Sequence, residues 1–122
     1  SRITGDDLLL MLQSDAKFRI YDGSSYRYTT TTIMSTGTWY HHVLTLASDG
    51  RTCKGYLNGV EEVSQTITNT AFINHSDYAI GRKYAGFGNY FNGKIANFKI
   101  YNRVLTSSEV LQNYNALKDR FI

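Results

Sequence analysis

Apolar and polar residues alternate over several short stretches of the chain, which is the pattern of strands that bury one face. The alternation is clear in residues 17–21, where Phe18 and Ile20 share one face. It is longest in residues 38–47. Trp39, His41, Val43 and Thr45 point one way there, and Tyr40, His42, Leu44 and Leu46 point the other. Other predicted strands are residues 8–13, 26–34, 52–57, 60–68, 77–82 and 94–102.

Turn signals separate these stretches, and Asn58-Gly59 is the strongest of them. Asp22-Gly23 and Asn92-Gly93 are of the same type. Roughly eight or nine short strands with turns between them predict an all-β fold, an antiparallel β-sandwich.

The end of the chain predicts one strand and one short helix. In residues 94–102 the alternation places Ala96, Phe98 and Ile100 on one face, which we expect to fill the core. Thr106-Ser107-Ser108-Glu109 then has the spacing of a capping box and predicts a helix start. Its apolar positions share one stripe that can lie on a sheet: Val110, Leu111, Tyr114 and Leu117.

Composition and charge restrict the classes of protein. A chain of 122 residues is one domain, residues 1–122, with enough length for one core. The net charge is +3 and the basic residues are dispersed, which argues against nucleic-acid binding. No apolar run approaches the ~20 residues of a membrane span. Cys53 is the single cysteine, so we expect a free thiol without a disulfide.

Three stretches resemble the laminin G-like, concanavalin A-like lectin-glucanase superfamily. They are Trp39 to Leu46 with Ser48-Asp49-Gly50, Gly55 to Val60, and Ile80-Gly81-Arg82 with the closing residues 91–95 and 100–106. The resemblance implies a jelly-roll β-sandwich, without naming a function. Only 38 residues precede Trp39, fewer than family members usually have. Either the module is compact, or its first strands are missing and an exposed edge needs a partner. We therefore expect a homo-oligomer or a larger complex.

Catalytic residues are not predicted. Glycosidases of this broad fold need two converging carboxyl groups ~5–9 Å apart. Glu61 and Glu62 are neighbours in a strand and point to opposite faces, and Glu109 belongs to the helix cap. No other catalytic motif is present, so we expect a protein that is not an enzyme.

Metal binding is not predicted from the histidines, because His41 and His42 diverge in a strand and His75 is remote in a loop. No cofactor is expected, with calcium left as an open alternative, because many relatives bind it on the sandwich rim. The acidic loop residues are not clustered. They are Asp6, Asp7, Asp15, Asp22, Asp49 and Asp77.

The best candidate for ligand binding is the glycine- and aromatic-rich loop at residues 82–92. Its aromatic rings can stack on a sugar or anchor a protein partner, and its polar side chains can donate directional hydrogen bonds. The alternative is that these rings pack over an open end of the sandwich. The predicted ligand-binding residues are Arg82, Tyr84, Phe87, Asn89, Tyr90 and Asn92. A weaker candidate of the same type is Tyr26-Arg27-Tyr28.

The function we expect is binding or assembly. The Asn113-Tyr114-Asn115-Ala116 ending resembles laminin G-like modules in virion and surface proteins of bacteriophages. This resemblance implies a non-enzymatic module of a virion or cell-surface protein, in contact with other protein chains or with host-surface glycans. The alternative is a carbohydrate-binding, lectin-like domain that is calcium-dependent or independent.

Overall fold

The computed structural model describes residues 9–21, 26–49, 51–66, 80–81 and 90–121. Within these ranges the chain forms two three-stranded antiparallel sheets and one α-helix. The first sheet joins β1 (Leu9–Leu12), β2 (Phe18–Tyr21) and β3 (Tyr26–Thr29) in that order. The second joins β4 (His42–Leu46), β5 (Thr52–Leu57) and β6 (Val60–Thr66). Helix α1 (Ser107–Leu117) continues into a 3-10 turn at Lys118–Arg120.

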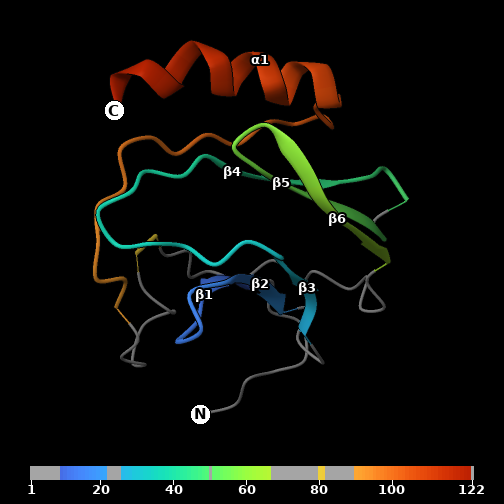
Figure 1. Ribbon diagram of the computed structural model, residues 1–122. Coiled ribbons are helices and arrows are strands. Elements are labelled where there is room, and N and C mark those ends of the chain that lie inside the picture. The colour runs from blue at the N-terminus through green and yellow to red at the C-terminus, as the bar shows by residue number, and fades with distance from the viewer. Residues whose placement is uncertain (1–8, 22–25, 50, 67–79, 82–89, 122) are drawn as a thin grey trace.

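The second sheet is the middle layer of the structure. Figure 1 shows it between the first sheet and α1. One apolar cluster connects the two sheets through Ile20 of β2 and Cys53 of β5, with Phe18, Leu44, Leu46 and Val63 packed around them. A second cluster lies between the middle sheet and the helix. It consists of Tyr56, Leu105 and Val110, with Val43 against it. The middle sheet therefore buries side chains on both faces.

The predicted alternation along β4 is confirmed. On the helix side, the ring of His41 lies 6.0 Å from that of Tyr114, and Trp39 lies 4.9 Å from Phe121. On the other side, the ring of His42 lies 4.5 Å from that of Phe18. The strand begins at His42, later than the predicted residue 38.

The reason lies at His41. Its N–H donates to the side-chain oxygen of Asn58 (2.9 Å), and its carbonyl accepts from the N–H of Asn58 (2.8 Å). Asn58 of the β5–β6 turn therefore binds the backbone of His41 in place of a partner strand, and β4 begins only at the next residue.

The Asn58-Gly59 hairpin forms as predicted between β5 and β6. Both residues have positive φ, 51° and 81°, which is the requirement of a type I′ turn. An ideal Cβ placed on Gly59 would lie 2.8 Å from Cδ1 of Leu111 and 3.1 Å from Cδ1 of Tyr114. The turn therefore packs directly against the helix, and a side chain at this position would require Leu111 and Tyr114 to shift.

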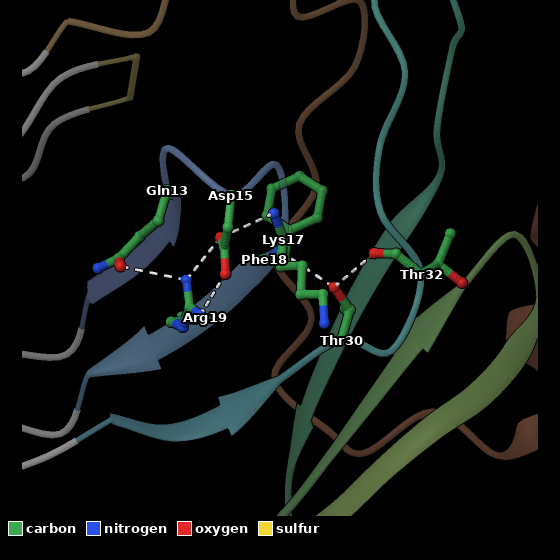
Figure 2. Close-up of polar contacts among 7 residues, drawn as sticks. All are labelled: Gln13, Asp15, Lys17, Phe18, Arg19, Thr30 and Thr32. Atoms are coloured by element: carbon green, nitrogen blue, oxygen red, sulfur yellow. Dashed lines mark hydrogen bonds and ion pairs between the residues drawn. The ribbon is translucent and has the colours of Figure 1, made fainter.

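The turn between β1 and β2 is fixed by Asp15, as Figure 2 shows. Its carboxylate accepts two hydrogen bonds from the guanidinium of Arg19, one at 2.7 Å, and a third from the N–H of Lys17 (3.3 Å). Gln13 accepts a further bond from Arg19 (3.1 Å). Ala16 takes a positive φ of 58°. Asp15 is therefore a turn-forming residue, which is the default interpretation of its type in this sequence.

The strand predicted at residues 26–34 is shorter than expected and ends at Thr29. Thr30 is buried, and its hydroxyl accepts from the N–H of Phe18 (3.1 Å) and donates to the carbonyl of Thr32 (3.2 Å) (Figure 2). The N–H groups of Thr31 and Thr32 donate to the carboxylate of Glu62 in β6. Because the Glu62 carboxylate binds these N–H groups, they do not bond to a neighbouring strand, and β3 ends before them.

The predicted strand at residues 94–102 is wrong, since the structure assigns no strand there. Ala96, Phe98 and Ile100 are exposed, so they do not fill the core. In the predicted strand at 77–82, Ile80-Gly81 forms a bend, and residues 77–79 and 82 lie outside the described ranges. Alternation identified residues that share a face, but pairing also requires a neighbouring strand.

Helix α1 begins as the sequence predicts. The Thr106 hydroxyl accepts from the N–H of Glu109 (3.2 Å), and the Glu109 carboxylate accepts from the N–H of Thr106 (3.0 Å). Arg103 donates to the same carboxylate at 2.8 Å. These bonds satisfy helix donors that otherwise lack partners.

We expect Thr106→Ala to lower the free energy of unfolding by about 1 kcal/mol, because the cap loses its acceptor. Urea unfolding followed by circular dichroism measures this loss. Thr106→Ser is the matched control, since it keeps the hydroxyl. Equal loss in both variants would contradict the capping role.

Candidate interaction surface

The predicted ligand loop is described only at its end. Arg82, Tyr84, Phe87 and Asn89 lie outside the described residues. Tyr90 and Asn92 are exposed, Tyr90 at 74%. The weaker candidate, Tyr26-Arg27-Tyr28, belongs to β3. The structure therefore extends the candidate site from Tyr90 toward the C-terminus, into a stretch that the sequence assigned to the core.

Exposed apolar side chains gather in residues 90–104, which we call the closing segment. In the described part of the chain, seven of the thirteen exposed large apolar side chains belong to it. Ile100 is 83% exposed and Phe98 is 59% exposed. The seven are Tyr90, Phe91, Ile95, Phe98, Ile100, Tyr101 and Val104. The segment therefore exposes apolar side chains along most of its length, and we treat it as a candidate interaction surface.

The closing segment is fixed at both ends, and between them it has no backbone partner among the described residues. At its start, the N–H of Phe91 donates to the carbonyl of Gly81 (2.7 Å). The ring of Phe91 also covers Gly93, where an added Cβ would lie 2.7 Å from it. At its end, Leu105 is buried below α1. Among described residues, no backbone–backbone hydrogen bond reaches residues 94–102. Their donors and acceptors are free of ladder partners there, which is the condition of an edge that accepts a strand.

The charge of this region is entirely positive. Lys94, Lys99 and Arg103 lie in the closing segment, and no acidic residue occurs between Asp77 and Glu109. Arg103 is paired with Glu109. Lys99 contributes to the lowered pKa of His41, after burial of the imidazole as the main cause. The surface is thus apolar with a weak cationic component.

Two carboxylates of β6, those of Glu61 and Glu62, have structural partners. Glu61 pairs with Lys54 (3.6 Å) and Glu62 binds Thr31 and Thr32, so the two diverge as predicted. Burial opposes ionisation of Glu62, but the bonds from Thr32 and Thr31 outweigh it and lower its pKa.

The Asp49 carboxylate closes the β4–β5 turn. It accepts from the N–H groups of Thr52 (2.9 Å) and Arg51 (2.8 Å), and these bonds lower its pKa. The described residues contain no group of three His, Cys, Asp or Glu side chains placed to hold a metal ion.

Two histidines lie on opposite faces of the middle sheet, as the sequence predicts. Burial lowers the pKa of His42 to about 4, with a smaller contribution from His41, while Glu62 acts in the other direction. The Nδ1 atom of His41 is buried and makes no hydrogen bond with the described residues. Burial therefore favours the neutral form of both imidazoles near pH 7.

Cys53 is a buried free thiol in β5, as expected. Burial raises its pKa to about 11, so the reactive thiolate is scarce at neutral pH. This cysteine is part of the core between the sheets.

The exposed surface was not recognised from the sequence. Phe98 and Ile100 were assigned to the core because they alternate with Asn97 and Lys99. The pattern itself gave no signal of exposure, because Arg19 lies between Phe18 and Ile20 in the same way in β2, a central strand.

The architecture defines a class of antiparallel β modules with one short C-terminal helix. The sequence model of the concanavalin A-like lectin/glucanases superfamily matches residues 2–111. The chain therefore belongs to this family. Its fold agrees with that membership, in two antiparallel sheets that share a core.

One solved structure with a similar fold is an S-layer domain-containing protein (residues 221–444) from Clostridium thermocellum. The TM-score is 0.53 and the identity is 23%, over 80% of this chain and 50% of that chain. The chain thus spans about half the length of that structure, and the likeness concerns the fold alone. No curated protein matches the sequence. No helix in the described ranges is long and apolar enough to span a membrane.

Proposed function

We propose that this chain is a non-enzymatic module of a larger cell-surface or virion protein, and that it acts by binding other protein chains during assembly. The observation that carries the proposal is the closing segment, where seven large apolar side chains are exposed within fifteen residues. Burying such side chains against a partner gains ~25 cal/mol per Å² of apolar area. The family and the S-layer protein with a similar fold support a surface location.

The environments of the acidic residues support a binding role over catalysis. Glu61, Glu62 and Glu109 each have a structural partner, and no two of these carboxylates act on a common site. We also propose that the two sheets of this chain form a jelly-roll β-sandwich. The shared core of Ile20 and Cys53, which joins one sheet to the other, supports it.

Site-specific photo-cross-linking tests the assembly function in the parent polypeptide. A benzophenone amino acid replaces Ile100, which is the most exposed apolar side chain of the closing segment. We expect irradiation to cross-link this position to another protein chain of the assembly. The matched control places the same group at Ile33, which is 64% exposed but lies outside the segment. Equal yields of protein adducts at both sites would contradict the proposal.

A glycan array separates this function from the lectin alternative. The feature that favours a lectin is the exposed ring of Tyr90 beside Asn92, since aromatic rings stack on sugars. Specific glycan binding that Tyr90→Ala abolishes, with no protein adduct at Ile100, would replace the assembly function by carbohydrate binding. If a calcium chelator abolished that binding, the carbohydrate-binding site would be calcium-dependent.

A further inference from the structure

The polarity of residues 94–102 is symmetric about Phe98. Asn97 and Lys99 flank it as polar neighbours, and Ala96 and Ile100 follow as apolar residues. Beyond these, Ile95 and Tyr101 are both apolar, and the ends Lys94 and Asn102 are both polar. Because an antiparallel partner runs in the opposite direction, a sequence with this symmetry is complementary to itself.

We propose that two copies of this chain pair through residues 94–102 as antiparallel strands, about a two-fold axis at Phe98. The inference rests on the proposed function and names the partner as a second copy. Each apolar residue then lies opposite an apolar residue, and each polar residue opposite a polar one. The pairs are Phe98 with Phe98, Asn97 with Lys99, Ala96 with Ile100, Ile95 with Tyr101, and Lys94 with Asn102.

Neighbouring registers match apolar residues with apolar ones, and polar residues with polar ones, less well. A shift that centres the axis on Asn97 places Ile95 opposite Lys99 and Lys94 opposite Ile100. A shift that centres it on Lys99 places two lysines directly opposite each other, which is destabilising. Each of these shifts places at least some apolar side chains opposite polar ones. The Phe98-centred register alone avoids all of these pairs.

The structure supplies the other conditions for this pairing. The side chains that would meet are exposed, including Phe98 on the axis and Ile100 two residues from it. Within the described ranges, the backbone of residues 94–102 has no strand partner that a second copy would displace. The Gly81 bond at Phe91 and the buried Leu105 hold the two ends of the segment in place. A two-fold interface of this kind closes on itself, because each copy offers the same surface.

Charge limits the strength of the pairing without preventing it. Lys99 lies opposite Asn97 of the second copy, so the two Lys99 side chains meet only diagonally. Diagonal neighbours are ~7–8 Å apart in an antiparallel pair. At 0.15 M salt the Debye length is ~8 Å, about equal to this separation, so the repulsion is partly screened. We therefore expect the association to strengthen with added salt.

Cysteine cross-linking tests the register. In Phe98→Cys the two introduced thiols lie directly opposite, ~4.5–5.5 Å apart between Cα atoms, which suits a disulfide. Mild oxidation is expected to convert most of this variant to covalent dimer on a non-reducing gel. Ile100→Cys alone is the matched control, since its two thiols would lie ~13 Å apart along the strand and give at least about tenfold less dimer. The wild type controls for Cys53, which is buried.

Mixing Ile100→Cys with Ala96→Cys provides an independent check, because these positions lie opposite each other in the proposed register. The mixture is expected to form covalent heterodimer while each variant alone does not. Sedimentation of the wild type is expected to show a dimer at high concentration that Phe98→Glu converts to monomer, with circular dichroism showing that the variant stays folded. Monomeric wild type, or equal cross-linking of Phe98→Cys and Ile100→Cys, overturns the proposal.

The photo-cross-linking experiment distinguishes self-pairing of two copies from the proposed assembly function. A photo-adduct at Ile100 that joins the parent polypeptide to a different protein retains the assembly function and overturns self-pairing. An adduct to glycan alone overturns both. An adduct between two copies of the parent polypeptide, together with the Phe98 disulfide, supports both.

Discussion

Lowering the pH from 7.5 to 5 is expected to reduce the free energy of unfolding by about 2 kcal/mol, and His42 is the main cause. Its imidazole is packed against Phe18 between the two sheets, and burial lowers its pKa from the usual 6.5 to about 4. In the unfolded chain the imidazole binds a proton below pH 6.5. The folded protein resists that proton until about pH 4, so stability is present above pH 6.5 and is lost as the pH falls.

The complete effect between pH 6.5 and 4 corresponds to about 3 kcal/mol, since one pKa unit is about 1.4 kcal/mol. Measurements should stop at pH 5, because acidic residues with lowered pKa begin to contribute below their usual values of 3.8 and 4.5. These are Asp15, Asp49, Glu62 and Glu109. Their contributions have the same sign, and they would hide that of the histidine at lower pH.

Urea unfolding at several pH values measures this dependence. His42→Leu should remove most of it while keeping an apolar side chain against Phe18. His41→Gln is the comparison variant, because it removes the neighbouring half-buried imidazole and leaves His42 in place. If the loss between pH 7.5 and 5 persists in His42→Leu, the buried imidazole is not its source.

Gly59→Ala is expected to destabilise the protein by about 2–3 kcal/mol. Part of this cost arises because an L-residue with a φ of +81° is strained by ~1–2 kcal/mol. The remainder is steric, since the new Cβ would overlap Leu111 and approach Tyr114, and overpacking costs ~1–3 kcal/mol. The Leu111 side chain would have to change its position and the Tyr114 ring would have to shift slightly to relieve the overlap.

Gly37→Ala isolates the backbone part of this effect. Gly37 has a similar φ of +75°, but nothing lies within 4 Å of the Cβ that alanine would add. We expect it to lose only ~1 kcal/mol by urea unfolding. The difference between the two variants then reports the contact between the hairpin and α1. Equal losses would show that this contact contributes little.

The sequence predicted the elements whose signals are local. Strand β5 was predicted at residues 52–57 and occurs there, because the Asp49 turn and the Asn58-Gly59 turn set its two ends. The capping box located the start of α1 for the same reason. The opposite orientations of His41 and His42 also followed from the strand period alone.

Elements that depend on distant partners were not predictable in this way. The end of β3 is set by Glu62, which is remote in sequence and takes the N–H groups of Thr31 and Thr32. The closing segment has the alternation of a strand, but alternation does not reveal whether another strand lies beside it. Of the candidate ligand loop, Tyr90 and Asn92 are exposed as binding requires, and the other four residues lie outside the described ranges.

The middle sheet has a consequence for synthesis on the ribosome. One of its faces is covered by β2, which precedes it in the chain, and the other by Leu105 and Val110, which follow it. At ~5–20 residues per second, the interval between the emergence of residue 66 and that of residue 117 is on the order of 2–10 s. During this interval the nascent chain presents Val43 and Tyr56 uncovered. Ribosome-bound chaperones therefore have a defined apolar target, and it disappears when α1 docks.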